Sequence, residues 1–243
     1  MACILSIESS IQVCSAAVSV DGKLVWNKEN TEPSSHSAVL GIYVAEAVRF
    51  IQTNHSGLDA VAVSEGPGSY TGLRISVSLA KGLCYGWNIP LIALPTLNVM
   101  ATRLAPSASY LCPMIDARRM EVYATLYDGN LNEIEPVRAV IIDEDSYRDI
   151  LNQKEIIFFG NGANKCRNVI RSPNAIFKDG VYPSASAMIE GAEKAYKTKS
   201  FVDIAYFEPF YLKDFQATTP KNKVFCTMPG NEHKTKRKLK LHV

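Results

Sequence analysis

Hydrophobic and polar positions alternate with a period of two near the start of the chain, a pattern typical of β-strands. It predicts strands over residues 3–8, 13–20 and 23–29. The second and third are joined by Val20-Asp21-Gly22-Lys23, whose Asp-Gly pair is a strong signal for a hairpin turn. The chain is therefore expected to open with an antiparallel meander.

Two long helices are predicted next, and both carry few charges. The first, over residues 37–52, has only Glu46 and Arg49 as charged side chains, and the second, over residues 73–87, has two basic residues. A surface helix normally buries one face, whereas a helix that is apolar nearly all round needs a second partner. The pattern leaves open whether that partner is the domain's own core or another subunit.

The rest of the chain alternates strands with helices, which predicts an α/β fold with mixed sheets and helices on their faces. The order of the first half recurs in the second, beginning near Pro106. We therefore expect lobes at residues 1–105 and 106–219 and a tail at 220–243. The further strands are predicted at residues 59–64, 90–94, 110–116, 122–127, 137–142 and 155–159, and the further helices at 96–104, 143–151 and 185–197.

The charge is distributed unevenly along the chain. The formal net charge is +2, but residues 221–243 hold seven basic residues and one acidic residue. The remainder is therefore acidic. Two interpretations stay open for this tail: a solvated terminus, or a basic arm that gains affinity for RNA by releasing counterions.

Cysteine usage and hydropathy indicate the compartment. The six cysteines include no C-x-x-C pair, which argues against a zinc ribbon or a dithiol redox site and favours reduced thiols. The uncharged stretch 82–102 contains Pro90 and Pro95, so it is interpreted as buried structure and not as a membrane span. The sequence thus predicts a cytoplasmic protein without a membrane partner.

A turn-rich segment, Gly66-Pro67-Gly68-Ser69-Tyr70-Thr71-Gly72, joins a predicted strand to a helix. Backbone N–H groups at such a junction favour anions. No Gly-Lys-Ser/Thr closes the loop as in a Walker A motif, and Thr71 stands where a dinucleotide fingerprint needs its third glycine. A rigid turn and an anion site remain equal alternatives.

Two other polar groups are ambiguous. Glu8-Ser9-Ser10 ends the first strand, where it could meet phosphate or metal or simply cap the turn. Asp116-Ala117-Arg118-Arg119 could bind phosphate, although two surface arginines are the commoner outcome. Leu40 follows His36 by four residues, where a helical metal pair would need a second ligand.

Residues 4–10, 14–18, 64–74, 80–83, 116–123 and 209–212 together form a recognisable set of motifs, of which SEGPGSYTGLR at 64–74 is the most specific. They resemble the TsaB (YeaZ) family over residues 2–219. The resemblance implies an actin-like ATPase (ASKHA) fold with two RNase H-like lobes. It also implies a scaffold subunit of the machinery that makes N6-threonylcarbamoyladenosine in tRNA, with the catalytic paralogue TsaD and the ATPase TsaE as partners.

The resemblance further implies a chain without catalytic residues or a metal. TsaD-like catalysis uses paired histidines on the first long helix, and here Leu40 replaces the second. The hairpin at Glu8 lacks the glycines of an active actin-like kinase, so we expect no nucleotide on the isolated chain and ATP or ADP only at the junction with TsaD. An actin-fold ATPase or phosphotransferase acting alone is the alternative function, and a metallopeptidase ranks third.

The resemblance to the family implies that helices of the first lobe contact the partner. The same face is expected to form a homodimer alone and a heterodimer with TsaD, and Leu40→Asp is expected to disrupt it. The predicted interface residues are His36, Leu40, Tyr43, Ala47, Leu79, Leu83 and Trp87. The residues expected near a junction nucleotide or a docking position are Gly66, Pro67, Gly68, Ser69, Thr71, Gly72 and Arg74.

Overall fold

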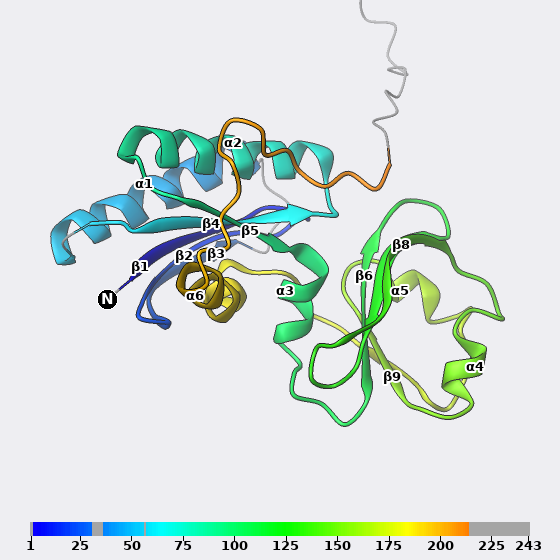
Figure 1. Cartoon of the computed structure of the whole chain (residues 1–243). Coiled ribbons are helices and arrows are strands. Elements are labelled where there is room, and N and C mark those ends of the chain that lie inside the picture. Colours follow the sequence, from blue (N-terminus) through cyan, green and yellow to red (C-terminus); the bar gives the residue numbers. More distant parts are fainter. Residues whose placement is uncertain (1, 31–35, 56, 214–243) are drawn as a thin grey trace, which may run out of the picture. The chain divides into compact units, whose positions relative to one another are not determined.

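The computed structural model describes residues 2–30, 36–55 and 57–213, which form two five-stranded sheets (Figure 1). The first sheet has the order β3-β2-β1-β4-β5 and the second the order β10-β9-β6-β7-β8. The strands of the first are β1 (Cys3–Glu8), β2 (Cys14–Val20), β3 (Lys23–Asn30), β4 (Ala60–Gly66) and β5 (Leu91–Pro95). Those of the second are β6 (Tyr110–Asp116), β7 (Glu121–Tyr127), β8 (Glu133–Ile141), β9 (Ile156–Phe159) and β10 (Ala175–Lys178).

Both sheets are mixed, and their topologies match. In the first, β1 pairs antiparallel with β2 and parallel with β4. In the second, β6 pairs antiparallel with β7 and parallel with β9. The predicted α/β class and the recurrence of one architecture in both halves are confirmed.

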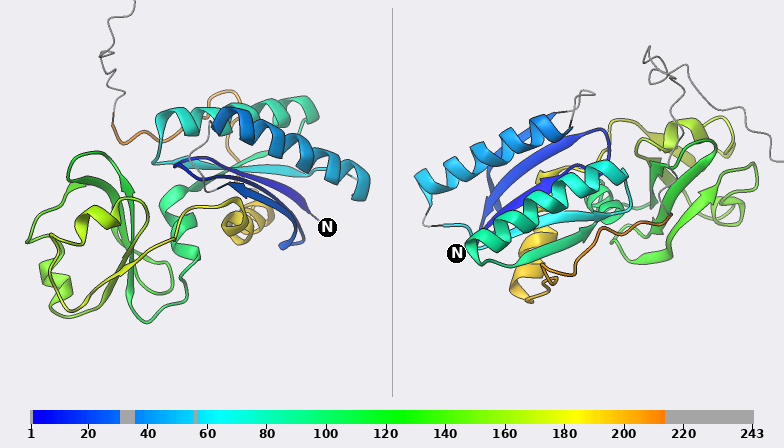
Figure 2. Two further views of the ribbon diagram at one scale, coloured as in Figure 1. Left: turned by 180° about the vertical axis from the view of Figure 1, so that it is seen from behind. Right: turned by 90° about the horizontal axis from the view of Figure 1, so that it is seen from above.

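The two long helices, α1 (His36–Asn54) and α2 (Tyr70–Trp87), lie side by side on one face of the first sheet (Figures 1 and 2). The opposite face is covered by the 3-10 helix η1 (Ala185–Met188) and α6 (Ile189–Lys197). The short helices α3 (Thr96–Thr102), α4 (Arg148–Leu151) and α5 (Ala163–Cys166) complete the described part of the chain. No helix among these described residues is long and apolar enough to cross a membrane.

The helix predicted over residues 143–151 is largely a turn. Asp143 accepts hydrogen bonds from the Asp145 N–H at 3.1 Å and the Ser146 hydroxyl at 2.8 Å, and its own N–H donates to Ser146 Oγ at 2.9 Å. Tyr147 then adopts a positive φ of 62°, and the helix begins only at Arg148. The side chains of Asp143 and Ser146 thus form local hydrogen bonds that take the place of helical backbone hydrogen bonds.

The predicted second lobe, residues 106–219, is wrong at its C-terminal end. The chain does pass to the second sheet near Pro106, but it returns after β10. Met188 and Ala192 are buried against Ile4 and Ile92 of the first sheet, and Val202 bridges to Leu91 of β5. The chain from η1 to Phe210 therefore belongs with the first sheet. The predicted tail at 220–243 lies outside the described residues.

The described cysteines lie in the core. Cys3, Cys14, Cys84, Cys112 and Cys166 are all buried and free of disulfides. Burial raises the pKa of the Cys112 thiol to about 12, so this group stays protonated and unreactive.

Candidate functional site

The 66–72 loop packs backbone to backbone on the bend that follows β1. A Cβ atom at Gly68 would lie 2.4 Å from the Ser10 carbonyl oxygen, and one at Gly72 would lie 2.0 Å from that of Ser9. The Ser69 N–H donates to the Ser10 oxygen at 2.6 Å, and the Ser9 hydroxyl donates to the Gly72 oxygen at 2.8 Å. Only glycine allows this approach, which supports the rigid-turn interpretation of the loop.

Other N–H groups of the loop are also satisfied within the chain. Gly66 donates to Thr96 Oγ1 at 3.1 Å, and Gly72 donates to Ser69 Oγ at 3.3 Å, so that Ser69 caps α2. An anion site needs N–H groups that point outward. Those of residues 66, 69 and 72 are not available for that purpose.

Glu8 is a fully buried carboxyl beneath this loop, with an exposed fraction of 0%. It accepts the Ser10 N–H at 2.6 Å, the Ser10 hydroxyl at 2.5 Å and the Ser64 hydroxyl. Loss of hydration raises the pKa of Glu8, and the hydrogen bonds from Ser10 and Ser64 offset only part of that rise. Both carboxyl oxygens thus have partners inside the chain, and the group is an internal brace of the bend.

Replacement of Glu8 by glutamine is expected to flatten the pH dependence of stability. Because the folded pKa is raised, the folded chain holds this proton more tightly than the unfolded chain. Folding stability is then lost as the pH rises from about 4.3, the ordinary glutamate value, through the raised pKa. The free energy of unfolding, measured with urea, should fall less between about pH 4 and pH 8 for Glu8→Gln than for the wild type. The exposed residue Glu190 gives the control Glu190→Gln, which should keep the wild-type pH dependence. The same pH dependence in Glu8→Gln would contradict this prediction.

The Asp116–Arg119 motif forms the tight turn between β6 and β7. Arg118 and Arg119 both adopt positive φ, 71° and 51°, and both side chains are exposed. Asp116 forms an ion pair with Lys165 and accepts the Arg118 N–H at 2.9 Å. The carboxylate is therefore neutralised by a neighbour, and the arginines are surface charges on a hairpin tip.

The bend that follows β1 leads directly into apolar packing between the two sheets. Ile11 and Val13, which follow the Glu8 bend, are buried in one apolar cluster with Ile115 and Phe159 of the second sheet. Apolar side chains thus fill the junction of the two sheets behind the bend. Within residues 2–30, 36–55 and 57–213, no group of three or more His, Cys, Asp or Glu side chains could hold a metal ion.

The predicted interface on α1 needs a correction. Leu40 and Ala47 have exposed fractions of 0% and lie in the core with Val44 and Ile51, the stripe that faces the sheet. Their assignment to a partner interface is wrong, because a residue without accessible surface cannot touch another chain. Leu40→Asp would place a charge in the core and unfold the first lobe instead of testing docking.

The other predicted interface residues keep accessible surface. Tyr43, Leu79 and Leu83 pack at the margin of the core and are half-buried, while Trp87 is 41% exposed at the end of α2. The side chain of His36 lies outside the described residues. The structure therefore shifts the candidate face outward from the predicted stripe on α1.

The outer surface of α1 and α2 carries mostly apolar and small side chains, with Arg49 and Arg74 as exposed charged residues. Ile42 is 57% exposed on it. We call this surface the docking face, and its residues are Gly41, Ile42, Ala45, Ile75, Ser78, Leu79 and Gly82.

Glycines on this face are not required by the chain's own packing. A Cβ atom at Gly41 or at Gly82 would meet nothing within 4 Å. Glycine inside a helix costs about 1 kcal/mol relative to alanine. These two positions therefore lower helix stability without a packing contact in the chain that requires glycine, and the missing side chains leave room at the helix surface.

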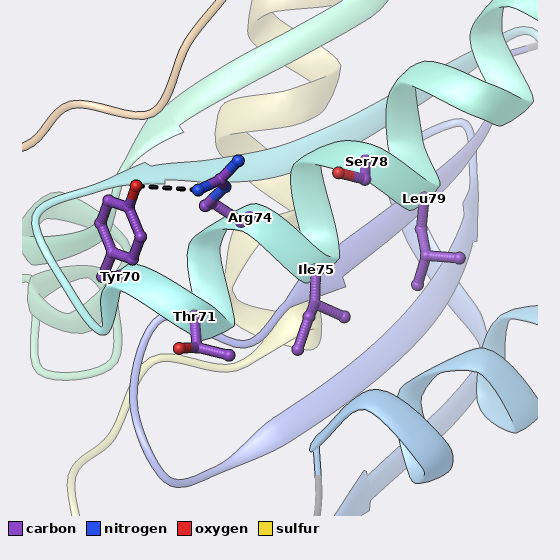
Figure 3. Close-up of a pocket in the computed structure, with 6 residues that line it drawn as sticks. All are labelled: Tyr70, Thr71, Arg74, Ile75, Ser78 and Leu79. Atoms are coloured by element: carbon purple, nitrogen blue, oxygen red, sulfur yellow. Dashed lines mark hydrogen bonds between the residues drawn. The ribbon is translucent and has the colours of Figure 1, made fainter. Parts of the chain in front are cut away.

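A shallow depression of about 600 Å³ adjoins the docking face at the start of α2 (Figure 3). Ile75 and Leu79 project from the same side of the helix, and Arg74 stands at the other end beside Tyr70. The Arg74 guanidinium donates to the Tyr70 hydroxyl at 2.8 Å and lies 5.2 Å from the centre of its ring. The lining residues are Tyr70, Thr71, Arg74, Ile75, Ser78 and Leu79.

Comparison with known proteins identifies the family of this chain. The model of the TsaD family, described as tRNA N6-adenosine threonylcarbamoyltransferase, matches residues 31–221. The tRNA threonylcarbamoyladenosine biosynthesis protein TsaB of Escherichia coli K12 is 28% identical over 237 residues, which cover 94% of this chain and 99% of that protein. The chain belongs to the TsaD family and, within it, to the TsaB (YeaZ) branch.

A solved structure has the same fold. A Pseudomonas aeruginosa protein described as similar to peptidase YeaZ superposes with a TM-score of 0.76 at 22% identity, covering 88% of this chain and 100% of that one. The TsaB-type fold, two actin-like lobes with mixed sheets, is thereby confirmed. A Bacillus subtilis tRNA N6-adenosine threonylcarbamoyltransferase is 31% identical over 119 residues, 42% of this chain and 34% of that protein.

For this TsaB-family chain, sequence reasoning located the helices of the docking face but missed the residues that distinguish its surface. The signal was present as Gly41 and Gly82, two glycines inside helices that carry few charges. Their meaning appears only when the structure shows open space above them.

Proposed function

We propose that this chain is a non-catalytic scaffold in the formation of threonylcarbamoyladenosine on tRNA, pairing with a TsaD protein in the cytoplasm. The printed names of its TsaB relatives support the pathway. The observation that carries the scaffold role is the docking face, a mostly apolar surface on which a Cβ at Gly41 or Gly82 would contact no other atom of the chain within 4 Å.

The docking face is large enough for a specific interface. Helices α1 and α2 have 19 and 18 residues. At 1.5 Å per residue each is about 28 Å long. Two such helices side by side, about 10 Å apart, present most of the ~800 Å² per partner that a standard interface buries. The same face pairs two copies of this chain when TsaD is absent.

Catalytic groups come from the partner in this proposal. Glu8 is enclosed by Ser10 and Ser64, and Asp116 is paired with Lys165, so neither carboxylate is poised for acid or base work. We propose that the isolated chain binds no nucleotide, and that any ATP or ADP lies at the junction with TsaD, toward Arg74. Calorimetric titration of the chain with Mg-ATP should give no binding heat, and micromolar binding would contradict this part.

Reconstitution tests the proposed function directly. The chain, TsaD, TsaE, tRNA and threonylcarbamoyl adenylate are combined, each protein is omitted in turn, and modified adenosine is measured by mass spectrometry. Scaffolding predicts product in the full mixture, little without this chain, and none from this chain alone. Full activity of the mixture with Glu8→Gln is also expected. Product from the chain alone, or an undiminished rate in its absence, would overturn the proposal.

A further inference from the structure

The segment that follows α6, residues 201–213, passes β5 and continues beside α2 after a turn in which the Phe207 N–H donates to the Asp203 oxygen at 2.8 Å (Figure 1, orange). We call it the strap. The Val202 N–H donates to the Leu91 oxygen at 3.0 Å, and Phe207 packs at the margin of the core. Lys81 of α2 donates to the carbonyl oxygens of Ala205 at 3.2 Å and Phe207 at 3.1 Å. The strap is thus held to β5 by a backbone hydrogen bond and to α2 by the side chain of Lys81.

The end of the strap holds the 66–72 loop. The Phe210 N–H donates to the Glu65 oxygen at 2.7 Å. The Phe210 oxygen lies so near Gly66 that a Cβ there would be only 2.5 Å away, at a φ of 119° that glycine tolerates. These contacts give a structural role to the motif at residues 209–212, which is not part of the docking face.

The contacts continue from the strap into the docking region. The ring of Tyr211 lies 4.9 Å from that of Tyr70, and Tyr70 in turn orients Arg74 through its hydroxyl. In the other direction, Lys213 forms an ion pair with Glu121 of the second sheet. A continuous series of contacts therefore links the second sheet to the depression at the start of α2.

We infer that Tyr211 is a positioning residue, which through Tyr70 holds Arg74 and the first turn of α2 in the arrangement to which TsaD binds. This inference rests on the proposed function, because it assumes that TsaD docks on the adjoining face. Tyr211 contacts Tyr70 and needs no contact with TsaD. The aromatic ring, and not the hydroxyl of Tyr211, makes this contact.

The test compares Tyr211→Ala with Tyr211→Phe in the full chain, with the dissociation constant for TsaD and the Tm measured for each. An aromatic pair typically carries enough interaction to change a binding constant about three- to tenfold. Tyr211→Ala should weaken TsaD binding by that factor, and Tyr211→Phe should restore it. Tyr206, 85% exposed on the same strap, gives the matched control Tyr206→Ala, which should bind like the wild type.

Tyr70→Phe supplies a second variant that keeps the ring and removes the hydroxyl that orients Arg74. It should weaken TsaD binding about threefold, even if Tyr211→Ala fails to fold. Wild-type affinity of both Tyr211→Ala and Tyr70→Phe, with binding still lost in Gly82→Leu, would overturn the positioning role and leave the docking face intact. Equal losses in Tyr211→Ala and Tyr206→Ala would also overturn it, because the strap would then touch TsaD directly. Wild-type affinity of Gly82→Leu would refute the docking face itself.

Discussion

Gly82→Leu is expected to weaken pairing with TsaD roughly 10- to 100-fold without lowering the stability of the chain. The position is exposed, and a Cβ atom there finds no atom of the chain within 4 Å, so the chain leaves room for a larger side chain to point outward. Helix propensity favours leucine over glycine by roughly 0.8 kcal/mol, so Tm should hold or rise slightly. Across a close interface, however, the added atoms must displace the partner, and overpacking costs about 1–3 kcal/mol.

The measurement is a titration of TsaD with each variant, beside thermal unfolding of the chain alone. Lys194→Leu on α6 is the matched control, because it places the same side chain on an exposed helical position of the opposite face of the first sheet. It should pair like the wild type. Unimpaired pairing of Gly82→Leu would mean that TsaD binds elsewhere.

Gly72→Ala is expected to destabilise the chain by about 3 kcal/mol, lowering Tm by roughly 6–12 °C. Gly72 lies within α2, so its backbone conformation suits alanine. The added Cβ would nevertheless lie 2.0 Å from the Ser9 carbonyl oxygen, a backbone atom that can move only if the bend after β1 moves. Helix propensity alone predicts the opposite sign, a gain of about 1 kcal/mol.

Gly82→Ala on the same helix is the control, because it makes the same chemical change where the space is open. It should raise Tm by about 2–4 °C. A lower Tm for Gly72→Ala and a higher Tm for Gly82→Ala would establish that close backbone packing requires glycine at position 72. A Gly72→Ala chain as stable as the wild type would contradict the packing described here.

Local patterns predicted the strands because their causes are local. The Asp-Gly turn and the alternation on either side placed β2 and β3, which the structure has at Cys14–Val20 and Lys23–Asn30. The start of α2 was missed by one turn. Ser69 caps the helix through the Gly72 N–H, but its surroundings are so rich in glycine and proline that the segment looked like loop.

Features that depend on distant contacts were not predictable in the same way. The pattern of α1 showed a helix that was apolar on more than one side, but it could not say which stripe meets the sheet. Leu40 and Ala47 proved to be core, and Ile42 proved to be surface. Likewise, nothing local in residues 201–213 indicates that Phe210 bonds to Glu65, because that contact spans most of the chain.

Hydrogen–deuterium exchange of the chain, alone and bound to TsaD, tests the docking face most directly. If the outer surface of the two long helices receives the partner, exchange should slow in peptides from α1 and α2 on complex formation, while peptides from α6 on the opposite face exchange as before. Unchanged exchange in α1 and α2, with slowing in α6 or in the second sheet instead, would contradict the account.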